Sequence, residues 1–372
     1  MPDTAPPGGP AGPLPADAVV LALDLGGTQI RAAAILPDGE RLGRRSAATP
    51  QGTDGEAIYD ACAGLLHSVL DFLPAELRTR AAAIGISSMG PIDPWRGLVV
   101  DPPNVPALRD APLADEMERR VGLPAWLDKD TNVAALAERW LGAARGSDHF
   151  IYVTVSTGLG AAVVRDGKLL HGPDGSAGEL GHVTLMPVDG PRCGCGGIGH
   201  LEAITSGSGV ANQARSIVET GAMPRATAWN VAWTASDPAL VSPPEPIASE
   251  YLARCMSAGP ITGRNVAEGE EAGDEVCRTL MFRARRAFAI ACVGWVNAFN
   301  PQQIIVGGTV AERQGDRLLG LARDEIAAHA FHVPAHRVRI EAPALGADVG
   351  LVGAWPLVAQ RFGVAEWRER RP

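Results

Sequence analysis

One arrangement of residues occurs twice in the chain and restricts the possible folds more than any other feature of the sequence. In residues 19–35 an apolar strand runs into Asp24-Leu-Gly-Gly-Thr28 and continues as a second strand. In residues 149–164 another strand runs into Ser156-Thr157-Gly158-Leu-Gly160 and again continues as a strand. Each copy begins a stretch in which strand and helix patterns alternate, so we predict two related α/β domains that face a cleft.

Both turns have the composition of a phosphate-binding hairpin. A P-loop or a Rossmann turn leads into a helix, whereas these turns lead into strands. Paired glycines allow backbone N–H groups to approach phosphate oxygens, and a threonine hydroxyl adds a donor. Asp24, at the strand end, is suited to hold Mg²⁺ or its water shell. Either turn alone is equally a plain hairpin turn, but the repetition favours phosphate binding. The candidate residues are Asp24, Gly26, Gly27, Thr28, Thr157, Gly158 and Gly160.

Four potential metal ligands, His182, Cys193, Cys195 and His200, lie within one glycine-rich stretch, residues 178–202. Zinc prefers four nitrogen or sulfur ligands in a tetrahedron, and a closed shell of four protein ligands is structural. The alternative is a glycine-rich loop with free cysteines and incidental histidines. We predict a zinc knuckle, whose loop would present the flanking acids Glu179 and Glu202.

An acidic segment follows the predicted strand 124–127. It reads Asp128-Lys129-Asp130-Thr131-Asn132 and precedes a predicted helix over about 133–142, with Thr131 or Asn132 as N-cap. Ligand chemistry in α/β sheets gathers at the carboxyl ends of strands, so Asp130 is a candidate general base. Alternatively, these acids only cap the helix. Asn104, after two prolines, is either a ligand for a polyol or a turn residue.

Further periodic segments complete the pattern. We predict helices over 55–72, 113–121, 206–219 and 275–299, strands over 81–87, 303–306 and 338–342, and a loop over 224–246. The strand 303–306 ends at Gly307-Gly308, a pair that permits flat approach of an adenine or ribose, or simply tight packing.

Composition excludes several classes of protein. The chain has 372 residues, a net charge of −9 and a pI of about 5.4, with no basic patch for nucleic acid. The remaining cysteines are scattered and indicate buried thiols in a reducing compartment. Residues 1–17 lack the features of a signal peptide and read as a disordered tail. The longest apolar stretch, 287–299, is too short to span a bilayer. We therefore expect a cytoplasmic protein without membrane or nucleic-acid partners.

These motifs, taken in order, resemble the ROK family (repressor, open reading frame, kinase), a branch of the actin-like/hexokinase ATPase superfamily. The resemblance covers about residues 18–358. It implies an α/β fold of the two-domain, actin-like (ribonuclease H-like) type with an interdomain cleft and a zinc knuckle. We expect a tail at 1–17, a smaller domain at 18–133 and a larger one at 134–372 that contains the zinc loop 178–202.

The resemblance also implies roles for individual residues. Asp130 would be the base that deprotonates a sugar hydroxyl. The sugar would be bound by Asn104, Lys129, Glu179, His182 and Glu202. The seven hairpin residues named above would surround the phosphates and Mg²⁺, and Gly307 and Gly308 would lie under the adenosine. The implied activity is ATP-dependent phosphorylation of a hexose, glucokinase-like, at the 6-hydroxyl, by a homodimer or homotetramer.

The chain departs from the family pattern at two positions. His200 stands where the fourth zinc ligand is usually Cys, and zinc accepts either. Lys129 stands where Asn is common; a cation close to Asp130 would lower the pKa of that carboxyl and weaken it as a base. A non-catalytic sugar sensor is therefore the alternative function. A repressor is disfavoured, because only a short tail precedes the first motif. The hexose and the donor, ATP or polyphosphate, stay open.

Overall fold

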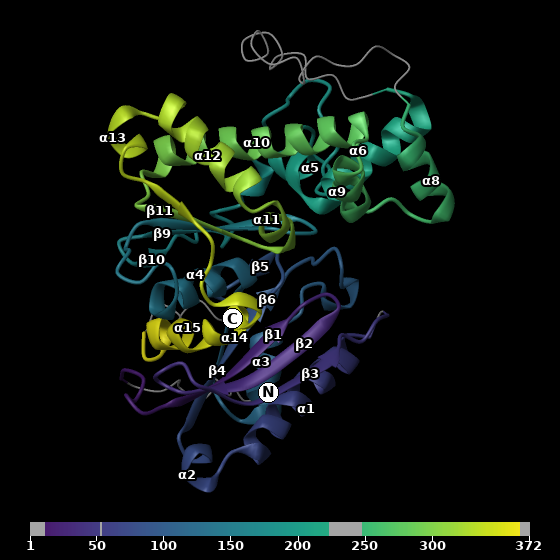
Figure 1. The fold of residues 1–372 in the computed structure, drawn as a ribbon. Helices are drawn as coiled ribbons and strands as arrows, with labels where there is room; N and C mark the ends of the chain where they lie inside the picture. Colours follow the sequence, from purple (N-terminus) through teal and green to yellow (C-terminus); the bar gives the residue numbers. More distant parts are fainter. Residues whose placement is uncertain (1–11, 53, 223–247, 365–372) are drawn as a thin grey trace. The chain divides into compact units, whose positions relative to one another are not determined.

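The computed structural model describes residues 12–52, 54–222 and 248–364 (Figure 1). The chain divides into two units. The first comprises the residues up to Gly146, Lys168–Ala177 and the residues from Pro343 onward. The second comprises Ser147–Gly167 and Gly178–Ala342. The predicted loop at 224–246 and residues 1–11 of the predicted tail lie outside the described residues.

The first unit is built on a five-stranded sheet in the order β3-β2-β1-β4-β7. Strands β1 (Val19–Leu25), β2 (Gln29–Ile35) and β3 (Arg41–Ala48) are antiparallel, whereas β4 (Ala81–Ser88) and β7 (Ala125–Lys129) run parallel to β1. A small hairpin of β5 (Ile92–Asp93) and β6 (Leu98–Val99) follows β4. The chain therefore makes a hairpin first and adds parallel strands afterwards.

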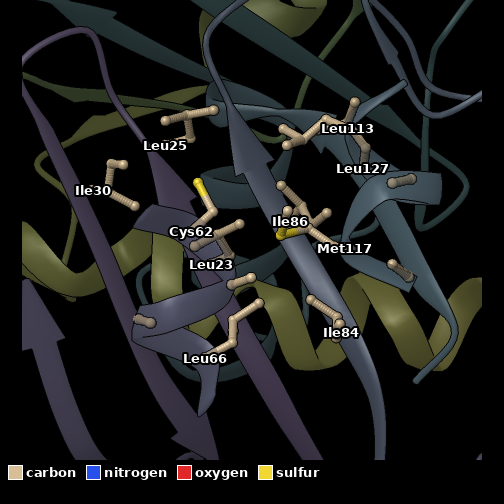
Figure 2. Close-up of a cluster of buried hydrophobic side chains, with 14 of the residues drawn as sticks. Leu23, Leu25, Ile30, Cys62, Leu66, Ile84, Ile86, Leu113, Met117 and Leu127 are labelled. Atoms are coloured by element: carbon tan, nitrogen blue, oxygen red, sulfur yellow. The ribbon is translucent and has the colours of Figure 1, made fainter. Parts of the chain in front are cut away.

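Strand β1 is apolar throughout because both of its faces are covered. Side chains at alternate positions point to opposite faces of a sheet. Leu21, Leu23 and Leu25 join one cluster with α1 (Gly55–Phe72) and α3 (Leu113–Val121), as Figure 2 shows for Leu23 and Leu25 beside Leu66 and Met117. Each fully buried Leu or Ile of this cluster contributes roughly 1.5–3 kcal/mol to folding.

The second face of the first sheet is covered by helices that come from two distant parts of the chain. They are α4 (Asp130–Leu141), α14 (Val349–Val352) and α15 (Ala354–Arg361). Val20 and Ala22 of β1 pack there with Leu351, Ala354 and Val358. Leu14 packs against the same cluster, so the described end of the predicted tail is part of the packed unit.

The second unit repeats this layout. Strands β8 (Phe150–Val155) and β9 (Leu159–Arg165) form an antiparallel hairpin, and β11 (Gln303–Gly307) and β12 (Arg339–Glu341) run parallel to β8. The prediction of two related α/β units is thereby confirmed.

Long helices supply the core of the second unit. Helix α10 (Glu275–Phe299) packs along α12 (Asp316–His329) and over the sheet, with Phe288 and Trp295 in the shared cluster (Figure 1). A smaller cluster joins the first half of α10 to α6 (Gly207–Thr220), α8 (Glu250–Ala258) and α9 (Gly263–Glu271). The other helices are α5 (Leu201–Thr205), α11 (Thr309–Gln314) and α13 (His332–Ala335), with α2 (Ala75–Arg78) in the first unit.

Helix ends follow their capping residues. The Asp54 side chain accepts from the Glu56 N–H at the start of α1, and Asp274 accepts from the Cys277 N–H at the start of α10. Asn300 ends α10 with a φ of 49°, in the left-handed conformation that Asn tolerates. The predicted bounds of α1 and α10 match the structure for this reason, and those of α3 match as well.

The two units differ from the sequence-based division at residue 133. Residues 134–146 and the segment from Pro343 onward group with the first sheet, because α4, α14 and α15 pack on it. Within the part of the chain that the structure describes, no helix combines the length and apolarity needed to cross a bilayer.

A glycine-to-alanine pair tests the contact between β4 and α15. A Cβ on Gly85 would lie 2.6 Å from the Ala354 carbonyl oxygen, so Gly85→Ala should lower the free energy of unfolding by about 1–3 kcal/mol. A Cβ on Gly64, in α1, meets nothing within 4 Å, so Gly64→Ala should raise stability by roughly 0.5–1 kcal/mol. Urea unfolding measures both; equal midpoints for the two variants would contradict the packing.

Candidate functional site

Asp24, in β1, is 9% exposed and already engaged. Its Oδ1 accepts a 2.9 Å hydrogen bond from the Ser87 hydroxyl, and its Oδ2 is paired with the Arg31 guanidinium. A Cβ on Gly350 would lie 2.9 Å from Oδ1, so the backbone of the C-terminal segment lies against this carboxylate. A cation at Asp24 would therefore share the carboxylate with Arg31.

The turn after β1 brings four of the predicted residues together, namely Gly26, Gly27, Thr28 and Asn104. Gly26 donates to the Gln29 carbonyl at 3.0 Å, and the Thr49 hydroxyl donates to the Gly26 carbonyl at 2.7 Å. A Cβ on Gly27 would lie 3.3 Å from the Cβ of Asn104, so Asn104 adjoins the turn. Thr28 and Asn104 are both exposed, as ligand contacts require.

Helix α4 begins earlier than the sequence predicts. Its first residue is Asp130 and its N-cap is Lys129, so the prediction of a start at 133 with a cap from Thr131 or Asn132 is wrong. The physical reason is the side chain of Asn132, which points back and donates a 2.7 Å hydrogen bond to Asp128 Oδ1. Asp130 is therefore an exposed carboxylate in the first helical turn, and its Oδ1 accepts from the Thr131 N–H at 2.6 Å.

A buried polar network lies directly before Asp130. Asp128 is 0% exposed, and its Oδ1 also accepts from the Lys129 N–H at 2.7 Å. Its Oδ2 is paired with the guanidinium of Arg361, from α15, and lies 2.8 Å from His171 Nε2. Arg361 is 2% exposed and donates a second bond, 2.8 Å long, to the Leu127 carbonyl.

The partners of Asp128 determine its protonation state. Burial on its own would raise the pKa of this carboxyl, but the charges of Arg361 and His171, with hydrogen bonds from His171 and Asn132, hold it well below the usual range. A depressed native pKa contributes stability that is present above the unfolded value of about 3.9 and is lost as the pH falls further. Asp128 is thus an ionised structural group, and Asp130 is the exposed acid beside it.

In the second unit the turn between β8 and β9 carries Thr157 and Gly158, and Gly160 lies within β9 opposite Thr154. The Ser156 and Thr157 carbonyls accept from the N–H groups of Gly207 and Ser208, at 2.8 and 3.0 Å. The Ser156 hydroxyl lies 2.9 Å from that of Thr309. The turn is therefore held by the first residues of α6 and α11.

A cavity of about 630 Å³ opens beside this turn. Its wall includes Ser156 and Thr157, and the starts of α6, α9 and α11. Arg215, Arg264 and Arg313 line it, as does Arg285, which forms a bidentate pair with Glu270 (2.7 and 3.0 Å). Helix N-termini and guanidinium groups both favour anions.

The four predicted metal ligands come together. Their ligand atoms all lie within 4.8 Å of one another. Cys193 Sγ is 3.7 Å from His182 Nδ1, and Cys195 Sγ is 3.2 Å from His200 Nδ1. Zinc bonds of about 2.0–2.3 Å place tetrahedral ligand atoms roughly 3.3–3.8 Å apart, so the Cys193–His182 pair lies within that range, the Cys195–His200 pair lies close to it, and the set of two thiols and two imidazoles suits zinc.

The backbone of the loop explains its glycines. Cys193 donates to the Gly197 carbonyl at 2.8 Å, and Gly196 donates back to the Cys193 carbonyl at 3.0 Å, which forms a tight knuckle. Gly199 has a φ of 66°, and a Cβ there would collide with the Met186 carbonyl. Burial raises the pKa of the Cys193 thiol to about 12, and Glu202 adds to the shift; a bound cation has the opposite effect.

The two acids that flank this group differ in their surroundings. Glu179 precedes the short 3₁₀ turn Leu180–His182, and its Oε2 lies 3.8 Å from His182 Nε2. Glu202 lies in the first turn of α5, where its Oε2 accepts a 2.9 Å hydrogen bond from the Leu159 N–H. Its Oε1 lies 3.4 Å from Cys193 Sγ.

Close packing explains the second glycine of the pair at the end of β11. Gly307 is the buried last residue of the strand, and Gly308 has a φ of 94°. A Cβ on Gly308 would lie 2.5 Å from the Val155 carbonyl. Neither glycine is in the wall of the cavity, whereas the next residue, Thr309, is.

Sequence reasoning missed several residues near these sites. Arg361 and His171 follow no motif, because only the folded chain brings them to Asp128. The arginines of the cavity were not predicted either. The starts of α6 and α9 could have indicated an anion-binding site there, because helix N-termini favour anions.

Comparisons with known proteins agree with this architecture. A glucokinase of Thermotoga maritima is 30% identical over 344 residues, which cover 92% of this chain and 98% of that protein. An N-acetylmannosamine kinase of Escherichia fergusonii is 40% identical over 195 residues, 52% of this chain and 64% of that protein. The crystal structure of a ROK family glucokinase from Streptomyces griseus, in complex with glucose and AMPPNP, matches with a TM-score of 0.67 and 29% identity, over 92% of this chain and 100% of that one.

Two units, each with a hairpin followed by parallel strands, define the fold as that of an actin-like ATPase. The family profile matches residues 20–361, and the chain belongs to the ROK family.

A pair of arginine substitutions tests the network around Asp128. Arg361→Leu leaves a buried carboxylate without its main partner, so the free energy of unfolding should fall by about 3–5 kcal/mol. Arg109 pairs with Asp101 on the surface, where both side chains are more than half exposed, and Arg109→Leu should cost less than about 1 kcal/mol. Urea unfolding compares them, and similar small losses for both would show that Asp128 does not depend on Arg361.

Proposed function

We propose that this protein is an ATP-dependent hexose kinase that transfers the terminal phosphoryl group of Mg-ATP to the 6-hydroxyl of a glucose-like sugar. The proposal is carried by Asp130, an exposed carboxylate in the first turn of α4, in a chain of the ROK family. The relatives of this chain include a glucokinase and an N-acetylmannosamine kinase.

The proposed reaction needs a base, a set of phosphate ligands and a bound sugar. A sugar hydroxyl is a poor nucleophile, so Asp130 accepts its proton as the sugar oxygen forms a bond to the γ-phosphorus. The bond between that phosphorus and the bridging oxygen breaks, and ADP leaves with the electron pair. Phosphoryl transfer otherwise depends on positioning and on charge neutralisation.

The phosphates and their Mg²⁺ are assigned to the two turns. Thr28, Thr157 and the glycines Gly26, Gly27, Gly158 and Gly160 offer hydroxyl or backbone donors, and Asp24 offers a carboxylate to the cation of Mg-ATP. The cavity of the second unit lies within the usual size range of small-molecule sites and would hold the nucleoside. Gly307 and Gly308, which directly precede the cavity-lining Thr309, remain assigned to the adenosine.

Five side chains are assigned to the sugar: Asn104, Lys129, Glu179, His182 and Glu202. Each carboxylate can accept from two neighbouring hydroxyls. Glu202 Oε2 accepts from Leu159, and Oε1 lies 3.4 Å from Cys193 Sγ; a metal ion bound by Cys193 would displace the thiol proton and leave Oε1 for a sugar. Lys129 is 6% exposed. It stands where Asn is common in the family, so a group that only donates hydrogen bonds takes the place of an amide that both donates and accepts them.

His182, Cys193, Cys195 and His200 are assigned to a structural zinc ion. Zinc would fix the conformation of the loop that carries Glu179 and leads to Glu202, without taking part in the reaction. The arrangement of the four ligand atoms supports this assignment.

The alternative function is a non-catalytic sugar sensor. The observation that favours it is Lys129, a buried cation one residue from Asp130, which would weaken that base if the ammonium lies close to it.

The kinase proposal predicts turnover that depends on Asp130. In a coupled assay of ADP release over hexoses and N-acetylhexosamines, the wild type should phosphorylate one sugar best. Asp130→Asn should lower kcat by about 10²–10⁴, because the proton acceptor is lost, while the sugar Kd from calorimetry changes little. Asp71→Asn, at an exposed position of α1, is the matched control and should keep full activity.

An outcome without turnover on any sugar, together with measurable sugar binding by the wild type, would reject the kinase and support the sensor. Replacing ATP by polyphosphate in the same assay distinguishes the two phosphoryl donors.

The metal assignment predicts about one zinc ion per chain by elemental analysis. Cys195→Ala removes one of the four ligands and should lose most of the metal, whereas Cys255→Ala, at a half-buried cysteine of α8, should retain it. Equal zinc content in both variants would show that the ion is bound elsewhere.

A further inference from the structure

The segment that follows the metal group holds the turn between β8 and β9 at three points. The carboxylate of Glu202 accepts from the Leu159 N–H at 2.9 Å, and the N–H groups of Gly207 and Ser208 donate to the Ser156 and Thr157 carbonyls. Residues 202–208 thus contact residues 156–159. Only the bond to Leu159 is made by a side chain, so a single substitution can remove it.

The Glu202 carboxylate also reaches the metal group. Its Oε1 lies 3.4 Å from Cys193 Sγ, and Glu202 follows His200, another of the four ligands, by two residues. One carboxylate therefore adjoins a metal-ligand set on one side and the phosphate-binding turn on the other.

Two features fix the position of this carboxylate. Helix α5, which carries Glu202, is buried at Leu201, Ala203, Ile204 and Thr205. A Cβ on Gly158 would lie 2.8 Å from Glu202 Oε2, so an alanine there would push the carboxylate away from its present position at Leu159. Gly158 has no positive φ, so the contact with Glu202, rather than the backbone conformation, favours glycine here.

We infer that Glu202 is a positioning residue that couples the His182–Cys193–Cys195–His200 group to the turn at Thr157 and Gly158. The inference rests on the proposed function, in which this turn contacts the phosphates of the donor. When the four ligands hold their ion, the start of α5 is fixed, and Glu202 holds the Leu159 amide and the shape of the turn. The metal group then supports nucleotide binding in the absence of any sugar.

Hydrogen–deuterium exchange of peptides spanning 156–165, without ligands, tests the bond itself. Glu202→Ala should speed exchange at the turn at least tenfold, because the Leu159 N–H loses a charged acceptor. Glu202→Gln retains a carbonyl oxygen and should stay within a few-fold of the wild type. Gly158→Ala leaves Glu202 in the sequence but displaces its carboxylate, and should reproduce the fast exchange of Glu202→Ala.

Glu179→Ala is the matched control, because it removes the other acid that flanks the same metal group, whose Oε2 lies 3.8 Å from His182 Nε2. It should leave the exchange of residues 156–165 unchanged. If Glu202→Ala and Gly158→Ala also leave that exchange unchanged, the coupling is refuted.

Calorimetry with AMPPNP and Mg²⁺, in the absence of sugar, tests the consequence. Glu202→Ala and removal of the metal by a chelator should each weaken nucleotide binding about tenfold, and Glu179→Ala should not. Because coupling between two sites is reciprocal, AMPPNP should raise zinc affinity by the same factor.

The two proposals fail in distinguishable ways. If the wild type binds no AMPPNP while Glu202→Ala still speeds the exchange of the turn, the coupling is supported and ATP is rejected as the donor. If the wild type binds AMPPNP equally well with and without the metal, and Glu202→Ala binds it as tightly as the wild type, the coupling is rejected and the kinase proposal stands.

Discussion

A carboxylate with no exposed surface lies at the carboxyl end of β7, and the surroundings of the proposed base are arranged around it. Asp128 can stay ionised there only because Arg361, His171 and Asn132 surround it with donors. Asn132 is drawn back toward Asp128, so the helix begins at Asp130 and the acid proposed as the base is set in its first turn. The C-terminal helix therefore acts on the site through one buried ion pair.

In the second unit, the corresponding turn is held in place by a different kind of interaction. In the first unit an acid of β1 itself, Asp24, is tied to Ser87 and Arg31 beside the turn. In the second unit the acid, Glu202, comes from a helix outside the hairpin and binds the backbone of the turn. The two hairpins share a layout but are braced by different groups, and among the described residues the group of potential metal ligands lies in the second unit.

Local patterns in the sequence predicted much of this structure. Apolar periodicity gave the bounds of α1 and α10, with Asn300 marking the end of α10, and the spacing of four residues indicated the group of potential metal ligands. The start of α4 was missed, because an interaction of Asn132 with Asp128 outweighs its capping preference. Arg361, His171 and the cavity arginines could not be predicted, since long-range packing alone assembles them. The oligomeric state and the sugar-contacting roles stay predictions.

The ion pair between Asp128 and Arg361 joins residues that are 233 positions apart in the chain. At translation rates of about 5–20 residues per second, Asp128 leaves the ribosome roughly 12–47 s before its partner is made. During that interval α15 does not yet cover one face of the first sheet. Burial of Asp128 would then leave its charge without the Arg361 partner. The first unit is thus the last to be completed although its sheet is synthesised first, and a nascent chain interrupted before Arg361 would be a natural substrate for chaperones.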